Sequence, residues 1–315
     1  MKVVTRDQLE ASLAELRASV KDPREGILGP RSYGWRLGGD VGLFLGGGRA
    51  GLLQLAHPMV AYAIDHHSAT RADVVGRFQR TFAHVFAMIF GNLEEAFAAA
   101  RRVHAIHARI HGEIREAVGG WPAGTRYHAN DPEALRWVHA TLVDTTLLVR
   151  ARIDGPVAPG DRDGYVADMN RFGALFGIPR ALLPASAAEH DAYMRQMFAS
   201  DRIAVAPCAR EMARFLVGRG VASARQPPLG RVTEALTHAW LPPHLAAQFE
   251  LRGSPLPTRL GLGAFTALYR ALPRAIAEIP SAGAARRRLD GLPPSRFAAW
   301  AERRLYALAQ RATGA

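Results

Sequence analysis

Cysteine is nearly absent from this 315-residue chain. The single cysteine, Cys208, cannot build a disulfide framework, a zinc ribbon, an iron–sulfur site or a C-x-x-C-H haem attachment. The N-terminus has no apolar stretch of signal-peptide length, and no window holds the roughly 18 uncharged apolar residues of a membrane span. We therefore expect a cytoplasmic protein without a transmembrane segment.

Lysine is also scarce, because only two of the 40 basic residues are lysines. The formal net charge is nevertheless +12, which is compatible with nucleic acid, a membrane surface or an anionic ligand as a partner. The arginines are scattered, and their densest run covers only Arg286, Arg287 and Arg288. This distribution favours a solvated arginine surface, so we expect no nucleic-acid partner.

Helical patterns follow one another along most of the chain, and no convincing run of alternating strands interrupts them. Residues 22–51 are rich in glycine and proline and are expected to be irregular. Apolar spacing and capping residues predict helices over residues 6–20, 73–90, 93–118 and 132–153, and another that begins at Ser186. The sequence therefore predicts an all-α fold, with residues 1–315 in a single domain.

A glycine-rich segment, Gly46 to Gly51, matches the G-x-G-x-x-G pattern of dinucleotide-binding loops. That function requires a βαβ unit and an acidic residue about 20 positions further on. Helical patterns follow instead, and no second strand appears. We interpret the glycines as a turn that allows helices to approach closely.

One face of the predicted helix 73–90 carries Arg77, Arg80, Thr81 and His84, at positions i, i+3, i+4 and i+7. Such a stripe can face water. It can also line an anion-binding or oxygen-handling pocket, since the face has few of the Glu and Lys residues typical of solvent-facing helices. Periodicity alone leaves both interpretations open.

On helix 132–153, His139 lies in the middle of an apolar face that includes Leu135, Leu142 and Val149. A histidine in this position is commonly a satisfied core residue. It is also the arrangement that an axial haem ligand needs, because a neutral imidazole nitrogen must project into an apolar cavity. Both interpretations remain open on the pattern alone.

Two further candidates for metal binding are weaker. His104, His107 and His111 share one face of the predicted helix 93–118, but the Glu-x-x-His spacing of di-iron bundles is absent. Cys208 follows Pro207 at a helix start, where a thiolate ligand is conceivable, but a small buried apolar residue is the simpler interpretation.

Several motifs, taken in order, resemble the MpaB and rubber-oxygenase (latex-clearing protein) superfamily. The resemblance is strongest over residues 31–240, which makes residues 241–315 a C-terminal helical extension of the same domain. The motifs are Trp35-Arg36, Gly46-Gly47, Leu52 to Pro58, His67-Ser68, Gly76 to Thr81, Phe90-Gly91, Ile106-His107 and Asp131 to Asp144.

The resemblance implies a globin-like helical core around a haem b pocket, and it implies oxygenase activity. Its proximal-histidine pattern, Arg-x-x-His-Ala, is similar to Arg136 to Ala140, which makes His139 the expected iron ligand and gives Arg136 an electrostatic role, such as binding a propionate. Its distal Arg-x-x-Lys-Thr pattern is similar to Arg77 to Thr81, with Arg80 in place of lysine. Arginine stays charged, so Arg80 is a poor general base but a good hydrogen-bond donor.

Three functions follow from these patterns and the resemblance. The first is a haem b oxygenase for a small apolar or isoprenoid-like substrate, with dioxygen as co-substrate and Arg77, Arg80 and Thr81 as catalytic residues. The second is a peroxidase or peroxygenase that uses peroxide at the same site. The third is a non-catalytic haem- or lipid-binding protein.

Overall fold

The computed structural model describes residues 2–67, 83–217, 219, 228–253, 261–263, 266, 267, 269, 270, 273, 277–293 and 295. Helices dominate this part of the chain, and its only sheet has two short strands, so the all-α prediction is confirmed. The elements in chain order are α1 (Arg6–Ser19), η1 (Pro23–Glu25), α2 (Tyr33–Gly38), η2 (Val41–Gly46), α3 (Gly47–Leu55), α4 (Pro58–His67), α6 (Leu93–His107), β1 (His111–Glu113), β2 (Arg126–His128), α7 (Pro132–Ile153), α8 (Pro159–Ala174), η3 (Arg180–Leu182), α9 (Ala187–Ala199), α10 (Pro207–Leu216), α11 (Pro228–Trp240), α12 (Pro243–Gln248) and α15 (Pro280–Leu289).

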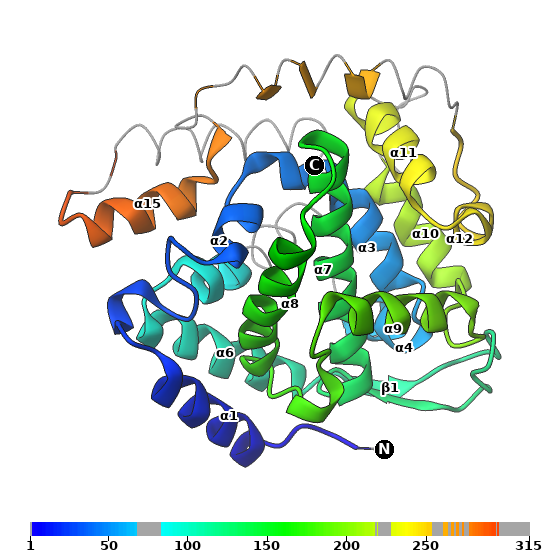
Figure 1. Ribbon diagram of the computed structural model, residues 1–315. Helices are drawn as coiled ribbons and strands as arrows, with labels where there is room; N and C mark the ends of the chain where they lie inside the picture. The colour runs from blue at the N-terminus through cyan, green and yellow to red at the C-terminus, as the bar shows by residue number, and fades with distance from the viewer. Residues whose placement is uncertain are drawn as a thin grey trace.

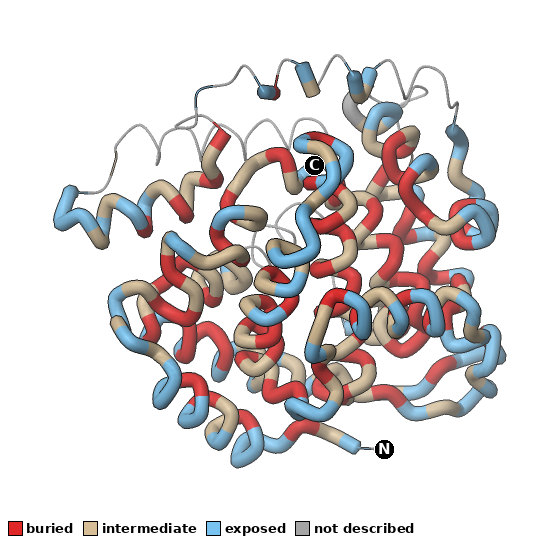
Figure 2. The backbone as a smooth tube through the Cα atoms, viewed as in Figure 1, coloured by how far each residue is buried: buried red, intermediate tan, exposed pale blue. Residues whose placement is uncertain are grey.

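Helix α7 runs through the middle of the fold (Figure 1). Asp131 caps it by accepting hydrogen bonds from the backbone N–H groups of Glu133 and Ala134, and Pro132 occupies its first turn. The helix contacts η2, α2, α3, α8 and α9. Because neighbours lie on several sides, most of its residues are buried, and Figure 2 shows the buried positions concentrated in this central region.

The glycine-rich segment brings three helical elements together, as the sequence predicts. A β-carbon at Gly46 would lie 2.5 Å from Cγ2 of Thr145 on α7. One at Gly48 would lie 2.2 Å from Oγ1 of Thr237 on α11. The segment forms η2 and the start of α3 rather than a strand and a phosphate-binding loop. Residues 22–51, expected to be irregular, therefore hold four short helical elements or parts of them.

The prediction of one helix over residues 93–118 is wrong in its second half. Helix α6 begins at the capping box of Asn92 and Glu95, as expected, but it ends at His107. The chain then turns into the antiparallel pair β1–β2, in which Gly112 lies opposite Tyr127. The sequence contains no sign of this end, because no glycine or proline directly follows His107. The strand that pairs with β1 comes from residues 126–128, well beyond the local pattern.

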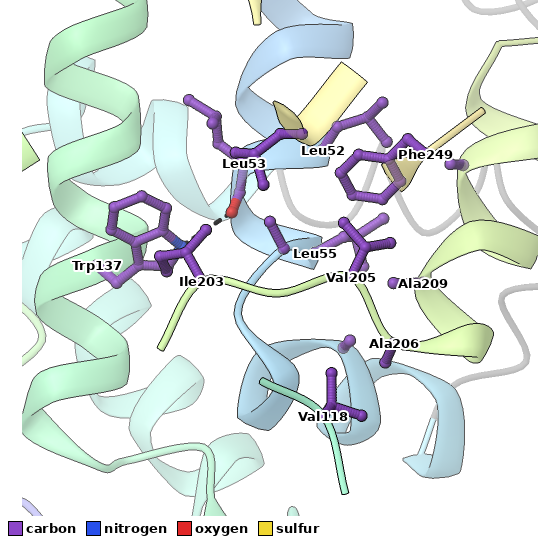
Figure 3. Close-up of a cluster of buried hydrophobic side chains, with 14 of the residues drawn as sticks. Leu52, Leu53, Leu55, Val118, Trp137, Ile203, Val205, Ala206, Ala209 and Phe249 are labelled. Atoms are coloured by element: carbon purple, nitrogen blue, oxygen red, sulfur yellow. Dashed lines mark hydrogen bonds between the residues drawn. The ribbon is translucent and has the colours of Figure 1, made fainter. Parts of the chain in front are cut away.

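The largest apolar cluster lies between α3, α4, α7, α10 and the chain that joins α9 to α10 (Figure 3). Trp137 is fully buried there, and its indole N–H donates to the carbonyl oxygen of Leu53 at 2.9 Å. This bond satisfies the polar atom of a large apolar side chain, and it fixes α7 against α3.

Candidate functional site

His139 lies on α7 with only 4% of its surface exposed, against helix α8. Its Nε2 atom is 2.8 Å from the carbonyl oxygen of Met169. Its ring stacks on Phe172, with 6.4 Å between the ring centroids and 24° between the planes. A β-carbon at Gly173 would lie 3.3 Å from Nε2, so the imidazole fills the space beside that glycine.

The protonation of His139 follows from this contact. A carbonyl oxygen only accepts hydrogen bonds, so Nε2 carries the proton and donates it to Met169. The pKa of His139 is lowered to about 4, mainly by burial; the bond to Met169 opposes this shift, and the nearby His190 adds to it. The imidazole is therefore neutral at pH 7.

These surroundings do not fit an axial haem ligand that binds through Nε2. A ligating nitrogen must offer a lone pair to the metal, whereas this nitrogen donates a proton to a backbone carbonyl. The expectation that His139 binds haem iron therefore stays a prediction, and its described geometry supports the alternative of a satisfied core histidine.

Arg136 has partners within the protein. Its guanidinium carbon lies 3.9 Å from the ring centroid of Tyr193, and Nη1 lies 3.7 Å from a carboxylate oxygen of Glu133. Its Nε is buried without a hydrogen-bond partner among the described residues. The predicted role toward a propionate remains a prediction.

The predicted distal residues Arg77, Arg80 and Thr81 lie outside the described residues. Of that stripe, only His84 falls in the described helical turns of residues 83–90. It is half-buried, and burial is the main cause that lowers its pKa, followed by the charge of Arg102.

The histidine stripe predicted on residues 104–111 is divided between two elements. His104 is on α6, where its Nε2 pairs with the carbonyl oxygen of Val4 at 2.9 Å. His111 is on β1, where its ring stacks on His128 with 6.1 Å between centroids. The prediction that His111 shares a helix face with His104 and His107 is wrong, because α6 ends at His107. In the described part of the chain, no three His, Cys, Asp or Glu side chains lie together as a metal site would require.

A polar group that the sequence reasoning did not select joins the end of α4 to the hairpin. Nδ1 of His66 lies 2.7 Å from the hydroxyl oxygen of Tyr127 on β2. Beside them, the hydroxyl of Tyr62 donates to the carboxylate of Glu116. The available signal was weak, because His66 is one of two histidines in the last turn of an apolar helix, and nothing in the spacing of residues 66 and 127 connects them.

A family model described as the catalytic domain of ER-bound oxygenase mpaB/B' and rubber oxygenase matches residues 35–276. The chain belongs to this family. The match confirms the resemblance found in the motifs and extends beyond residue 240, where the resemblance was strongest. No curated protein and no solved structure matches the chain.

Membership of the mpaB and rubber-oxygenase family supports oxygenase activity in general. The family name includes ER-bound members, and no helix in the described ranges is long and apolar enough to cross a membrane. The cytoplasmic location and the single-domain organisation stay predictions.

Proposed function

We propose that this protein is a haem b-dependent oxygenase that acts on an apolar, isoprenoid-like small molecule, with dioxygen as co-substrate. The observation that carries the proposal is the oxygenase catalytic-domain match over residues 35–276. The haem and the substrate class come from the resemblance of the motifs.

Haem, when bound, would supply an iron at which dioxygen is activated. His139 would be its ligand only if the ring left the carbonyl of Met169, so we derive no step through the iron from the described geometry. Among the described residues, the resemblance assigns a role at the haem to His139, as the iron ligand, and to Arg136, as the partner of a propionate.

The first experiment determines the cofactor. The purified full chain, expressed with haem precursor, should show a Soret band and about one iron per chain. His139→Gln keeps an N–H donor for Met169 but cannot replace an imidazole as an axial ligand. Loss of the Soret band in this variant would assign the ligand to His139. The matched variants are His104→Gln, His107→Gln and His111→Gln, which test the other histidines predicted to bind metal. A purified wild-type chain without haem would contradict the cofactor assignment.

The second experiment determines the reaction. The haem-loaded protein is incubated with geraniol or squalene under ¹⁸O₂, with and without a reductant, and the products are analysed by mass spectrometry. An oxygenase incorporates ¹⁸O from dioxygen into the product. Product that forms only after addition of hydrogen peroxide, and that takes its label from H₂¹⁸O₂ and not from ¹⁸O₂, would support the peroxygenase alternative. Ligand binding without product would support a non-catalytic protein.

A further inference from the structure

His66 is the last residue but one of α4, and its two ring nitrogens have different surroundings. Nδ1 is bonded to the hydroxyl of Tyr127 at 2.7 Å. Nε2 is buried and has no hydrogen-bond partner among the described residues. A buried polar atom without a partner costs free energy, so its retention needs a reason.

The β1–β2 hairpin restricts the position of the Tyr127 side chain. Gly112 lies opposite Tyr127 in the β1–β2 pair. A β-carbon at Gly112 would lie 2.6 Å from the Tyr127 hydroxyl oxygen and 2.9 Å from Cζ, so the phenol lies across the strand in space that only glycine leaves. Tyr127 is 1% exposed, which leaves its ring little freedom to turn.

The position of the protons follows from the partners. Tyr127 forms no other side-chain hydrogen bond within the described residues, and burial raises its pKa to about 12, so its hydroxyl stays protonated. If the hydroxyl donates to Nδ1, only one group, the N–H at Nε2, lacks a partner. The opposite tautomer would leave both the phenol proton and the Nε2 lone pair without partners. His66 therefore presents a buried N–H donor.

The surroundings determine what kind of acceptor fits. The ring of Tyr62 packs edge-on against His66, with 5.4 Å between centroids, and the apolar Ala63 and Ile64 of α4 pack against the large core cluster. The Tyr62 hydroxyl donates to Glu116 and forms no hydrogen bond with Nε2 of His66 within the described residues. Burial is the main cause that lowers the pKa of His66, the positive charge of Arg115 adds to it, and the carboxylate of Asp65 opposes both.

We propose that the Nε2–H of His66 binds the oxygen-bearing end of an otherwise apolar ligand, an alcohol, carbonyl or carboxylate, and that Tyr127 positions this donor. The proposal rests on the proposed function and narrows its substrate class to oxygenated apolar molecules rather than pure hydrocarbons. His66 acts here as a binding residue, and Tyr127, which reaches the ligand only through His66, is a positioning residue.

The test uses the full chain with ¹⁵N-labelled histidine and three matched ten-carbon isoprenoids. Geraniol ends in an alcohol, geranic acid ends in a carboxylate, and myrcene has no oxygen. Long-range ¹H–¹⁵N spectra should show His66 as the Nε2–H tautomer, and geraniol and geranic acid should shift that signal. Both should bind about tenfold more tightly than myrcene, as expected for one hydrogen bond to a buried donor.

Four variants separate a specific role from a structural one. His66→Phe should abolish the preference for the oxygenated ligands, whereas His66→Gln, which offers an N–H in a similar place, should retain part of it. Tyr127→Phe should mix the two His66 tautomers and reduce the preference. His67→Gln is the control, because Nε2 of His67 pairs with the carbonyl oxygen of His111, and it should leave the preference unchanged. Thermal melts confirm that each variant is folded.

Equal binding of all three compounds, binding of none, or an unchanged preference in His66→Phe would overturn the proposal. Binding is read from the histidine signals and needs no turnover. A failed oxygenase assay with an intact ligand preference would therefore count against the proposed function and not against the His66 site.

Discussion

The Nε2 atom of His139 donates its proton to the carbonyl oxygen of Met169, 2.8 Å away across the contact between α7 and α8. The bond joins two central helices through a ring that is almost completely buried. Burial keeps the imidazole neutral, although the bond itself opposes the lowering of the pKa, so the protonation of His139 and the stability of the fold are coupled.

This coupling predicts a pH dependence of stability. The pKa of His139 is about 4 in the folded protein, compared with 6.5 for an exposed histidine, so between these values only the unfolded chain is protonated there. The free energy of unfolding should therefore fall as the pH drops through this window, by about 3 kcal/mol from this one residue. Urea denaturation at pH 7 and pH 4 would measure it.

His139→Gln keeps the N–H donor but does not titrate, so the stability gap between wild type and variant should shift by that amount between pH 7 and pH 4. The exposed His111→Gln is the matched control. A wild-type-to-variant gap that is the same at both pH values would show that His139 does not titrate in this way.

The glycine-rich turn gives a prediction with an internal control. Gly46→Ala and Gly48→Ala should each lower the free energy of unfolding by about 1–3 kcal/mol, because the added methyl meets a threonine side chain of a neighbouring helix. Gly47 has a helical backbone, with φ of −56°, and among the described residues no atom beyond its own helical turn lies within 4 Å of an added β-carbon. Gly47→Ala should leave stability unchanged or raise it by up to about 1 kcal/mol.

Thermal melts of the three single variants measure this. Thr145→Ser removes the Cγ2 atom that crowds Gly46 but keeps the hydroxyl that Arg49 bonds, so it should partly rescue Gly46→Ala. Equal effects of all three alanines would mean that helix propensity, and not close approach, explains the glycines.

Much of the fold could be predicted because its signals are local. Asp131 caps α7, which begins at the next residue, Pro132. Ser186 likewise caps α9, which begins at Ala187. The end of α6 could not be predicted, since the hairpin that follows depends on pairing with Tyr127, fifteen residues beyond Gly112. Local spacing contains no information on such a partner.

The site was harder to predict than the fold for the same reason. The apolar face of α7 correctly indicated that His139 is buried, but not whether its nitrogen meets a metal or a carbonyl. That choice depends on Met169, thirty residues further along the chain. His66 was missed because its partner comes from another element.

Cys208 should be an unreactive thiol in the folded protein. Although it lies in the first turn of α10, burial raises its pKa to about 12, and the charge of Asp65 adds to the effect. Ellman's reagent at pH 8 should label it far more slowly in the native chain than in urea. Rapid native labelling, or a Soret band that shifts in Cys208→Ser, would contradict the interpretation as a buried apolar residue.

The predicted distal stripe can be tested through turnover. If Arg80 stabilises charge that develops on oxygen, Arg80→Ala should retain haem but slow the reaction by about 10²–10³. Arg80→Lys should preserve activity if charge alone matters, and the exposed Arg17→Ala should have no effect. Wild-type ligand kinetics and turnover in both Arg80→Ala and Thr81→Ala would show that the stripe is a solvated surface.

The ion pair between Arg49 and Asp144 should be among the most costly to break in the protein. Arg49 is 3% exposed, and its guanidinium donates to Asp144 at 2.5 Å, to the Thr145 hydroxyl at 2.7 Å and to the carbonyl oxygen of Trp240 at 2.8 Å. These contacts tie α3 to α7 and to the end of α11. Removing one partner of such a buried pair costs about 3–5 kcal/mol, because the other groups lose their hydrogen bonds in the interior.

Arg49→Met should therefore lower the free energy of unfolding by that amount in urea at pH 7. Asp144→Asn should also destabilise, since it leaves the arginine charge buried, and the double variant should cost less than the sum of the two. Arg17→Met breaks an ion pair of similar length with Glu94 on the surface, and should change stability far less. If Arg49→Met does not fold, Arg49→Lys keeps the charge but loses the planar fork, and should fall between wild type and Met. Strict additivity of Arg49→Met and Asp144→Asn would show that the two side chains do not interact across the α3–α7 contact.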